Sequence, residues 1–159
     1  MPDVFVAGLD GQTRKKSIDI LNANLAEGIA LTLAVKQAHW NLKGQGFIGV
    51  HELLDDVAAR LRDGTDLLAE RAVILGGFAR GTQEVVADTA KMEPYPVEIS
   101  SINDHIAALK ERFLFVGEAV RKGIDAAGEA GDEDTADILT EVSRAIDKDA
   151  WFIGANAPV

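Results

Sequence analysis

The chain has 159 residues, of which 47% are hydrophobic and 26% charged, and its formal net charge is −10. It contains no cysteine, which excludes disulfides, zinc fingers and thiolate-held iron–sulfur clusters. The acidic balance should repel nucleic acid and attract cations. The sequence shows no apolar run of the roughly 18 residues that span a membrane and no basic-then-apolar start, so we expect one cytoplasmic domain over residues 1–159.

Residues 1–11 predict a short N-terminal arm whose only apolar cluster is at positions 4–6. We expect this arm to be extended and packed or partly mobile. From about Gln12, apolar residues recur at three- and four-residue steps as far as His39 and Trp40. This periodicity predicts a first helix of nearly thirty residues.

The stretch NLKGQGFIG, residues 41–49, carries three glycines and predicts the connection to a second helix. That helix is expected over Val50–Gly77, ending at a pair of glycines. One face of it carries an imidazole and three carboxylates, which are ligands for hard and borderline metal ions. The four side chains belong to His51, Asp55, Asp66 and Glu70.

These ligands cannot form one metal site within a single helix. Asp55 and Asp66 are eleven residues apart, or about 16 Å along the axis, whereas a ligand atom lies about 2.0–2.6 Å from its ion. A two-fold axis near residue 60 or 61 would bring the two halves together from two antiparallel chains. The alternative is a solvated face with helical ion pairs to nearby arginines.

The next region, residues 78–99, is irregular because of its glycine and prolines, with a short helix expected at 83–88. Such a long crossover lets the third helix of a bundle start far from the end of the second. The third helix should follow Ser100 or Ser101 as N-cap. His105 on this helix has no acidic partner at a repeated metal spacing, and we interpret it as a surface or packing residue.

Residues 128–134 predict an acidic turn, and a fourth helix should be capped by Asp134 or Thr135. Acids at its start either complement the helix dipole or form a cation-attracting mouth in an oligomer. The candidates for such a mouth are Asp132, Asp134, Asp137 and Glu141.

Four helices with a long second-to-third crossover predict an all-α, ferritin-like four-helix bundle. The common di-iron form of that bundle carries Glu-x-x-His on two helices. Lysine or isoleucine stands three residues before each of the three histidines, so the motif is missing. This absence favours a metal site between chains.

The stretches KQAHWNLKGQGFIGVHELLDD, DLLAERAVILGG, DEDTADIL and DKDAWFI resemble the Dps family of mini-ferritins, and the resemblance covers the chain from the first helix onward. It implies a hollow homododecamer in the bacterial cytoplasm that oxidises Fe²⁺, preferably with hydrogen peroxide, and stores a ferric mineral. It also implies an iron site, with a two-iron centre possible, that combines residues of two subunits: His39, His51 and Asp55 of one, Asp66 and Glu70 of the other.

Many DNA-binding family members carry a lysine-rich tail, whereas residues 1–11 here contain no Lys or Arg. Phosphate neutralisation supplies most non-specific DNA affinity, so the sequence argues against DNA binding unless Mg²⁺ or the basic residues 14–16 supply it. Two alternatives to an iron-storing ferroxidase remain: a protein that compacts DNA with iron oxidation secondary, and a purely structural bundle.

Overall fold

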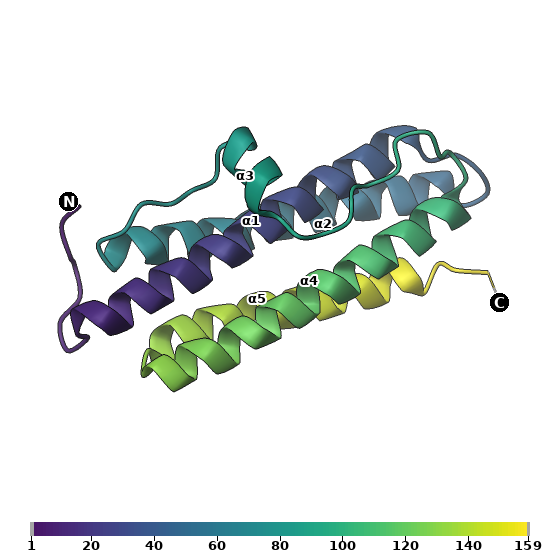
Figure 1. Ribbon diagram of the computed structural model, residues 1–159. Helices are drawn as coiled ribbons and strands as arrows, with labels where there is room; N and C mark the ends of the chain where they lie inside the picture. The colour runs from purple at the N-terminus through teal and green to yellow at the C-terminus, as the bar shows by residue number, and fades with distance from the viewer. Residues whose placement is uncertain (1, 159) are drawn as a thin grey trace.

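The computed structural model describes residues 2–158, within which the chain forms five helices and no strand. Two antiparallel pairs build the bundle, α1 (Gly11–Asn41) with α2 (Phe47–Ile74) and α4 (Ile102–Ala130) with α5 (Glu133–Gly154), while short α3 (Gln83–Thr89) lies outside against α1 (Figure 1). The all-α four-helix bundle and its helix-bearing crossover are therefore confirmed.

Side-chain caps fix where the helices begin. Asp10 accepts a hydrogen bond from the Thr13 N–H at 2.7 Å, which starts α1 one residue before the predicted point. Ser101 caps α4 as predicted, accepting from the Asp104 N–H and donating to its carboxylate. Helix α5 is capped by Asp132 and not by Asp134 or Thr135, so the turn before it is shorter than expected.

Helix α2 is displaced from the prediction by three residues at each end. It starts at Phe47, because Gly46 takes the left-handed conformation (φ 82°) and Gly49 is accommodated inside the first turn. It ends at Ile74, and Gly76 turns the chain away at φ 90°. Both His51 and Glu70 therefore lie within one continuous helix.

The four long helices enclose the core. By length and composition α1 could cross a membrane, but it is a core helix of this bundle, with Leu21, Leu31 and Val35 fully buried. The largest side chain in the centre is Phe113 of α4, also buried. Burying such side chains away from water supplies most of the stability of a helical bundle.

Polar contacts fasten the crossover to the bundle. The Glu27 carboxylate accepts from the Lys91 N–H at 2.5 Å and the Met92 N–H at 3.1 Å. Tyr95 bonds the ring of His105 at 2.7 Å. His105 is buried, and burial lowers its pKa below the ordinary value, so it is a packing residue and not a surface one.

The N-terminal arm is extended and packed along the end of α2 (Figure 1). The Phe5 N–H donates to the Ile74 carbonyl at 3.0 Å. The side chain of Val4 lies so close to Gly76 that a Cβ there would meet it at 2.7 Å. The arm thus becomes part of the surface at the C-terminal end of α2.

Candidate metal centre

The end of α1 and the start of α2 place two histidine rings face to face. The rings of His39 and His51 stack with their centroids 3.7 Å apart and their planes 17° from parallel. Nδ1 of His39 donates to the His51 carbonyl at 2.8 Å, and Nδ1 of His51 donates to the His39 carbonyl at 2.9 Å. Because a carbonyl only accepts, both rings carry a proton on Nδ1, and in the neutral ring Nε2 then has the lone pair that a metal ion would bind.

A carboxylate, that of Asp55, lies beside the ring of His39. Asp55 Oδ1 lies 3.7 Å from Nε2 of His39, and its side chain is 59% exposed. The pKa of Asp55 is lowered from its ordinary value, chiefly by the hydrogen bond from Lys36. Asp55 is therefore an ionised carboxylate that faces solvent beside Nε2 of His39.

Lys36 is a part of this centre that the sequence interpretation missed. Its Nζ lies 2.5 Å from Asp55 Oδ1 and 5.7 Å from the centre of the Trp40 ring. The ammonium group of Lys36 occupies the position beside Asp55 where a metal ion would bind. A metal ion would therefore have to displace this ammonium group or bind beside it. Its position three residues before His39, on the same helix face, was the available signal.

The other two predicted ligands do not join this cluster. Asp66 and Glu70 are exposed on α2, and neither forms an ion pair within residues 2–158. Helix α2 is continuous, so the separation of about 16 Å between Asp55 and Asp66 stands. In the described part of a single chain, no three His, Asp or Glu side chains are close enough to hold a metal ion.

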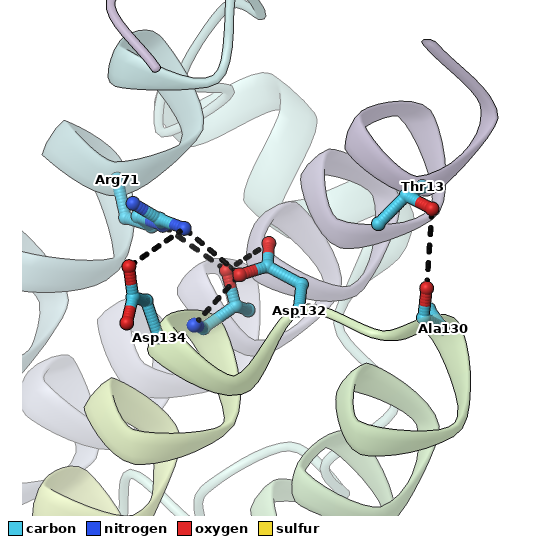
Figure 2. A network of polar contacts seen from close by, with 6 residues as sticks. Thr13, Arg71, Ala130, Asp132 and Asp134 are labelled. Atoms are coloured by element: carbon cyan, nitrogen blue, oxygen red, sulfur yellow. Dashed lines mark hydrogen bonds and ion pairs between the residues drawn. The ribbon is translucent and has the colours of Figure 1, made fainter. Parts of the chain in front are cut away.

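The four acids predicted to form the mouth divide into one buried and three exposed groups. Asp132 is 1% exposed; it accepts from Arg71 Nη2 at 2.8 Å and from the Thr135 hydroxyl at 2.7 Å (Figure 2). A pore-lining role for Asp132 does not fit this geometry. The acids that face solvent are Asp134, Asp137 and Glu141.

The pKa of Asp132 reflects this pairing. Burial raises the pKa, but hydrogen bonds from the side chain and backbone of Thr135 and the charge of Arg71 outweigh burial, and the pKa falls below its ordinary value. Asp132 is therefore an ionised cap that joins the start of α5 to the end of α2 (Figure 2).

Comparison with known proteins assigns the chain to a family. The ferritin-like domain matches residues 18–157. The DNA protection during starvation protein of Agrobacterium fabrum is 49% identical over 148 residues, covering 93% of this chain and 91% of that protein. The chain belongs to the Dps family of ferritin-like proteins.

Solved Dps structures share the whole fold. DpsA14 from Streptomyces coelicolor superposes with a TM-score of 0.91 at 32% identity, covering 97% of this chain and 91% of that chain. The tetragonal form of Mycobacterium smegmatis Dps gives a TM-score of 0.91 at 31% identity, covering 96% and 93%. The predicted family and bundle are thus confirmed.

Proposed function

We propose that this Dps chain is a subunit of an iron-storing ferroxidase cage in the bacterial cytoplasm. It would oxidise Fe²⁺, preferably with hydrogen peroxide, and retain the ferric product inside a hollow dodecamer. The observation that carries the proposal is the stacked pair of His39 and His51, whose Nε2 atoms are both left free beside the ionised Asp55. Imidazole nitrogen and carboxylate oxygen together suit Fe²⁺.

The proposed site is completed by a second chain. Asp66 and Glu70 lie on the same helix as Asp55 but too far along it to reach the same ion. A two-fold axis between two antiparallel α2 helices would set them against the His39, His51 and Asp55 cluster of the partner chain, twice in each interface. The five side chains offer enough donor atoms for one iron or for a two-iron centre.

The chemistry follows from the substrates. Each Fe²⁺ gives up one electron, and one hydrogen peroxide takes two electrons and two protons to become two waters. Supplying both electrons from neighbouring irons avoids the one-electron reduction of peroxide that releases a hydroxyl radical. Carboxylates from both chains stabilise the higher charge of Fe³⁺ as it forms.

Iron would reach the cage interior past the exposed acids of α5. Asp134, Asp137 and Glu141 lie on one face of this helix, within about 60° of each other. Three copies gathered at a junction of subunits would form a ring of negative charge that concentrates divalent cations. Asp137 is the principal candidate because it is exposed and lies between the other two acids along the helix axis.

Protection of DNA, the role in the name of the Agrobacterium relative, would come here from consuming iron and peroxide. Residues 1–10 carry two aspartates and no Lys or Arg, and the chain has a net charge of −10. Such a surface offers phosphate groups little to bind. We therefore propose iron chemistry as the main function and DNA compaction as no more than secondary.

The test of the shared site is complementation between two inactive variants. One variant carries His39→Ala, His51→Ala and Asp55→Ala, and the other carries Asp66→Ala and Glu70→Ala. An interface between unlike chains then contains one intact site and one site without ligands. Random co-assembly at equal amounts should restore about a quarter of the wild-type sites, read as the amplitude of Fe²⁺ oxidation by peroxide in stopped flow.

A variant with all five substitutions is the matched control, because mixing it with either parent creates no intact site. Sedimentation of each mixture verifies that large assemblies form. A site built within one chain would regain no activity on mixing the two parents, and that result would reject the shared site.

A further inference from the structure

A third aromatic ring lies against the two histidines of the candidate metal centre. Phe47 is the first residue of α2 and stands four residues before His51, so the two side chains share one face of the helix. Their ring centroids are 4.9 Å apart and their planes 29° from parallel. His51 thus stacks on two rings, that of Phe47 from its own helix and that of His39 from α1.

The two rings cover opposite faces of His51. Two rings stacked on the same face of an imidazole, with centroids 3.7 Å and 4.9 Å from its own, would overlap each other. Phe47 therefore lies on the face that His39 leaves open. His39 is 7% exposed and is held by the packing of the bundle, whereas His51 is only half-buried. The outer face of His51 is therefore covered by Phe47.

The orientation of the His51 ring decides which of its atoms meets a metal ion. The torsion that turns an imidazole about its bond to Cβ is broad and roughly two-fold, so a half-turn of the ring is readily adopted where nothing opposes it. That half-turn exchanges Nε2 with Cε1, a carbon atom that binds no metal ion. Here the half-turn is opposed by the hydrogen bond from Nδ1 to the His39 carbonyl, at 2.9 Å, and by the rings on both faces.

The first turn of α2 has little else to hold it in place. Its N-cap is Gly46, which has no side chain to accept a hydrogen bond, and the turn contains no acid. Helix ends fray when such groups are missing. The stack on His51 joins Phe47 in this uncapped turn to a ring that is itself bonded to α1.

We propose that Phe47 is a positioning residue for His51, whose ring it holds so that Nε2, and not Cε1, faces the metal ion. This inference rests on the proposed iron site and adds to it a residue that touches neither iron nor oxidant. Loss of a group that orients a metal-ligating histidine typically lowers metal affinity by about 10–100-fold. A stacked ring restricts the imidazole less directly than a hydrogen bond, so we take the lower end, about tenfold.

The test removes the ring and leaves every ligand in place. Phe47→Leu keeps an apolar side chain at this position, and Phe47→Tyr keeps the ring. Co²⁺ is the probe for binding, because it takes the same nitrogen and oxygen ligands as Fe²⁺ and its visible absorption reports the coordination geometry. Titration of the assembled protein with Co²⁺ should give an affinity about tenfold lower in Phe47→Leu, with a changed spectrum, and wild-type binding in Phe47→Tyr.

Oxidation of Fe²⁺ by peroxide gives a second readout. All the ligands remain in Phe47→Leu, so the KM for Fe²⁺ should rise by about tenfold and kcat should stay unchanged. This split is the pattern of an interaction that contributes equally to binding in the ground state and in the transition state. A residue that only stabilised the fold would lower the midpoint of thermal unfolding without producing the split.

Phe115→Leu is the matched control. It makes the same substitution at an aromatic residue of α4 that is 40% exposed, against 36% for Phe47. His51→Ala identifies the part of the Co²⁺ signal that depends on His51. If Phe47→Leu does not assemble, Phe47→Met is compared with Phe115→Met, because methionine also lacks a ring.

Equal Co²⁺ affinity in wild type, Phe47→Leu and Phe115→Leu would overturn the proposal and leave the iron site intact. A loss of affinity that Phe47→Tyr shares would also overturn it, because the effect would then not come from the ring. A Co²⁺ signal that His51→Ala leaves unchanged rejects His51 as a ligand, and the positioning role with it. Co²⁺ binding that depends on Phe47, in a protein that does not oxidise Fe²⁺, rejects the ferroxidase function alone.

Discussion

The pair formed by Arg71 and Asp132 should be one of the most sensitive polar contacts in the fold. Both side chains are nearly inaccessible, at 9% and 1%, and they join α2 to the start of α5 (Figure 2). Asp132→Asn keeps an oxygen that can accept from the Thr135 N–H but removes the negative charge. Arg71 is then a buried cation without its partner, apart from the exposed Asp134 at 3.9 Å.

Breaking a buried ion pair from one side costs about 3–5 kcal/mol. We take the lower end, about 3 kcal/mol, because Asp134 can still approach the guanidinium. For a domain of this size each kcal/mol lowers the midpoint of thermal unfolding by about 2–4 °C. Asp132→Asn should therefore lower Tm by about 6–12 °C, measured by circular dichroism at pH 7 and fixed protein concentration.

The double variant Arg71→Met/Asp132→Asn tests the cause. It removes the unpaired charge, so it should be more stable than Asp132→Asn alone. The pKa of Asp132 is lowered in the folded chain, so its contribution is present above the ordinary pKa of the carboxyl group and is lost as pH falls through the lower folded value. The difference from wild type should shrink below about pH 4. Additive losses in the double variant would refute the pairing as the cause.

Two further predictions concern surface charge. Asp137→Asn should slow Fe²⁺ uptake by about tenfold, the lower end of electrostatic steering, and leave assembly unchanged. The control is Glu111→Gln, which removes an exposed acid elsewhere. Equal uptake of Fe²⁺ by both variants in stopped flow would mean that the α5 acids only cap the helix. The wild-type assembly should not retard DNA at neutral pH and physiological salt without divalent cations, because each chain carries a net charge of −10. A gel shift at low protein concentration that weakens steeply with salt would show an overlooked basic surface.

The number, order and faces of the helices were predictable because each long helix repeats apolar residues at three- and four-residue steps. The start of α2 was not, because three glycines in NLKGQGFIG resembled a loop. The structure uses Gly46 in a left-handed turn and keeps Gly49 within the helix, where it costs only about 1 kcal/mol. Spacing alone does not separate these two uses of glycine.

Contacts between distant segments limited the prediction of the site. Spacing along α2 brought His51 and Asp55 together, and the resemblance to the Dps family added His39. Neither indicated Lys36, whose ion pair depends on how α1 and α2 pack. Acid clustering on α5 likewise gave no sign that Asp132 is buried against Arg71, sixty-one residues away. The roles of Asp66 and Glu70 stay a prediction, since they depend on a second chain.

The charge of the proposed seam links pairing of the chains to iron. Asp55, Asp66 and Glu70 would bring three negative charges together, and Lys36 neutralises one of them through its ion pair with Asp55. The remaining two repel each other until a cation binds, which opposes pairing of the chains. Bound Fe²⁺ would balance the two charges, and by linkage a ligand that binds only the paired state strengthens the pairing.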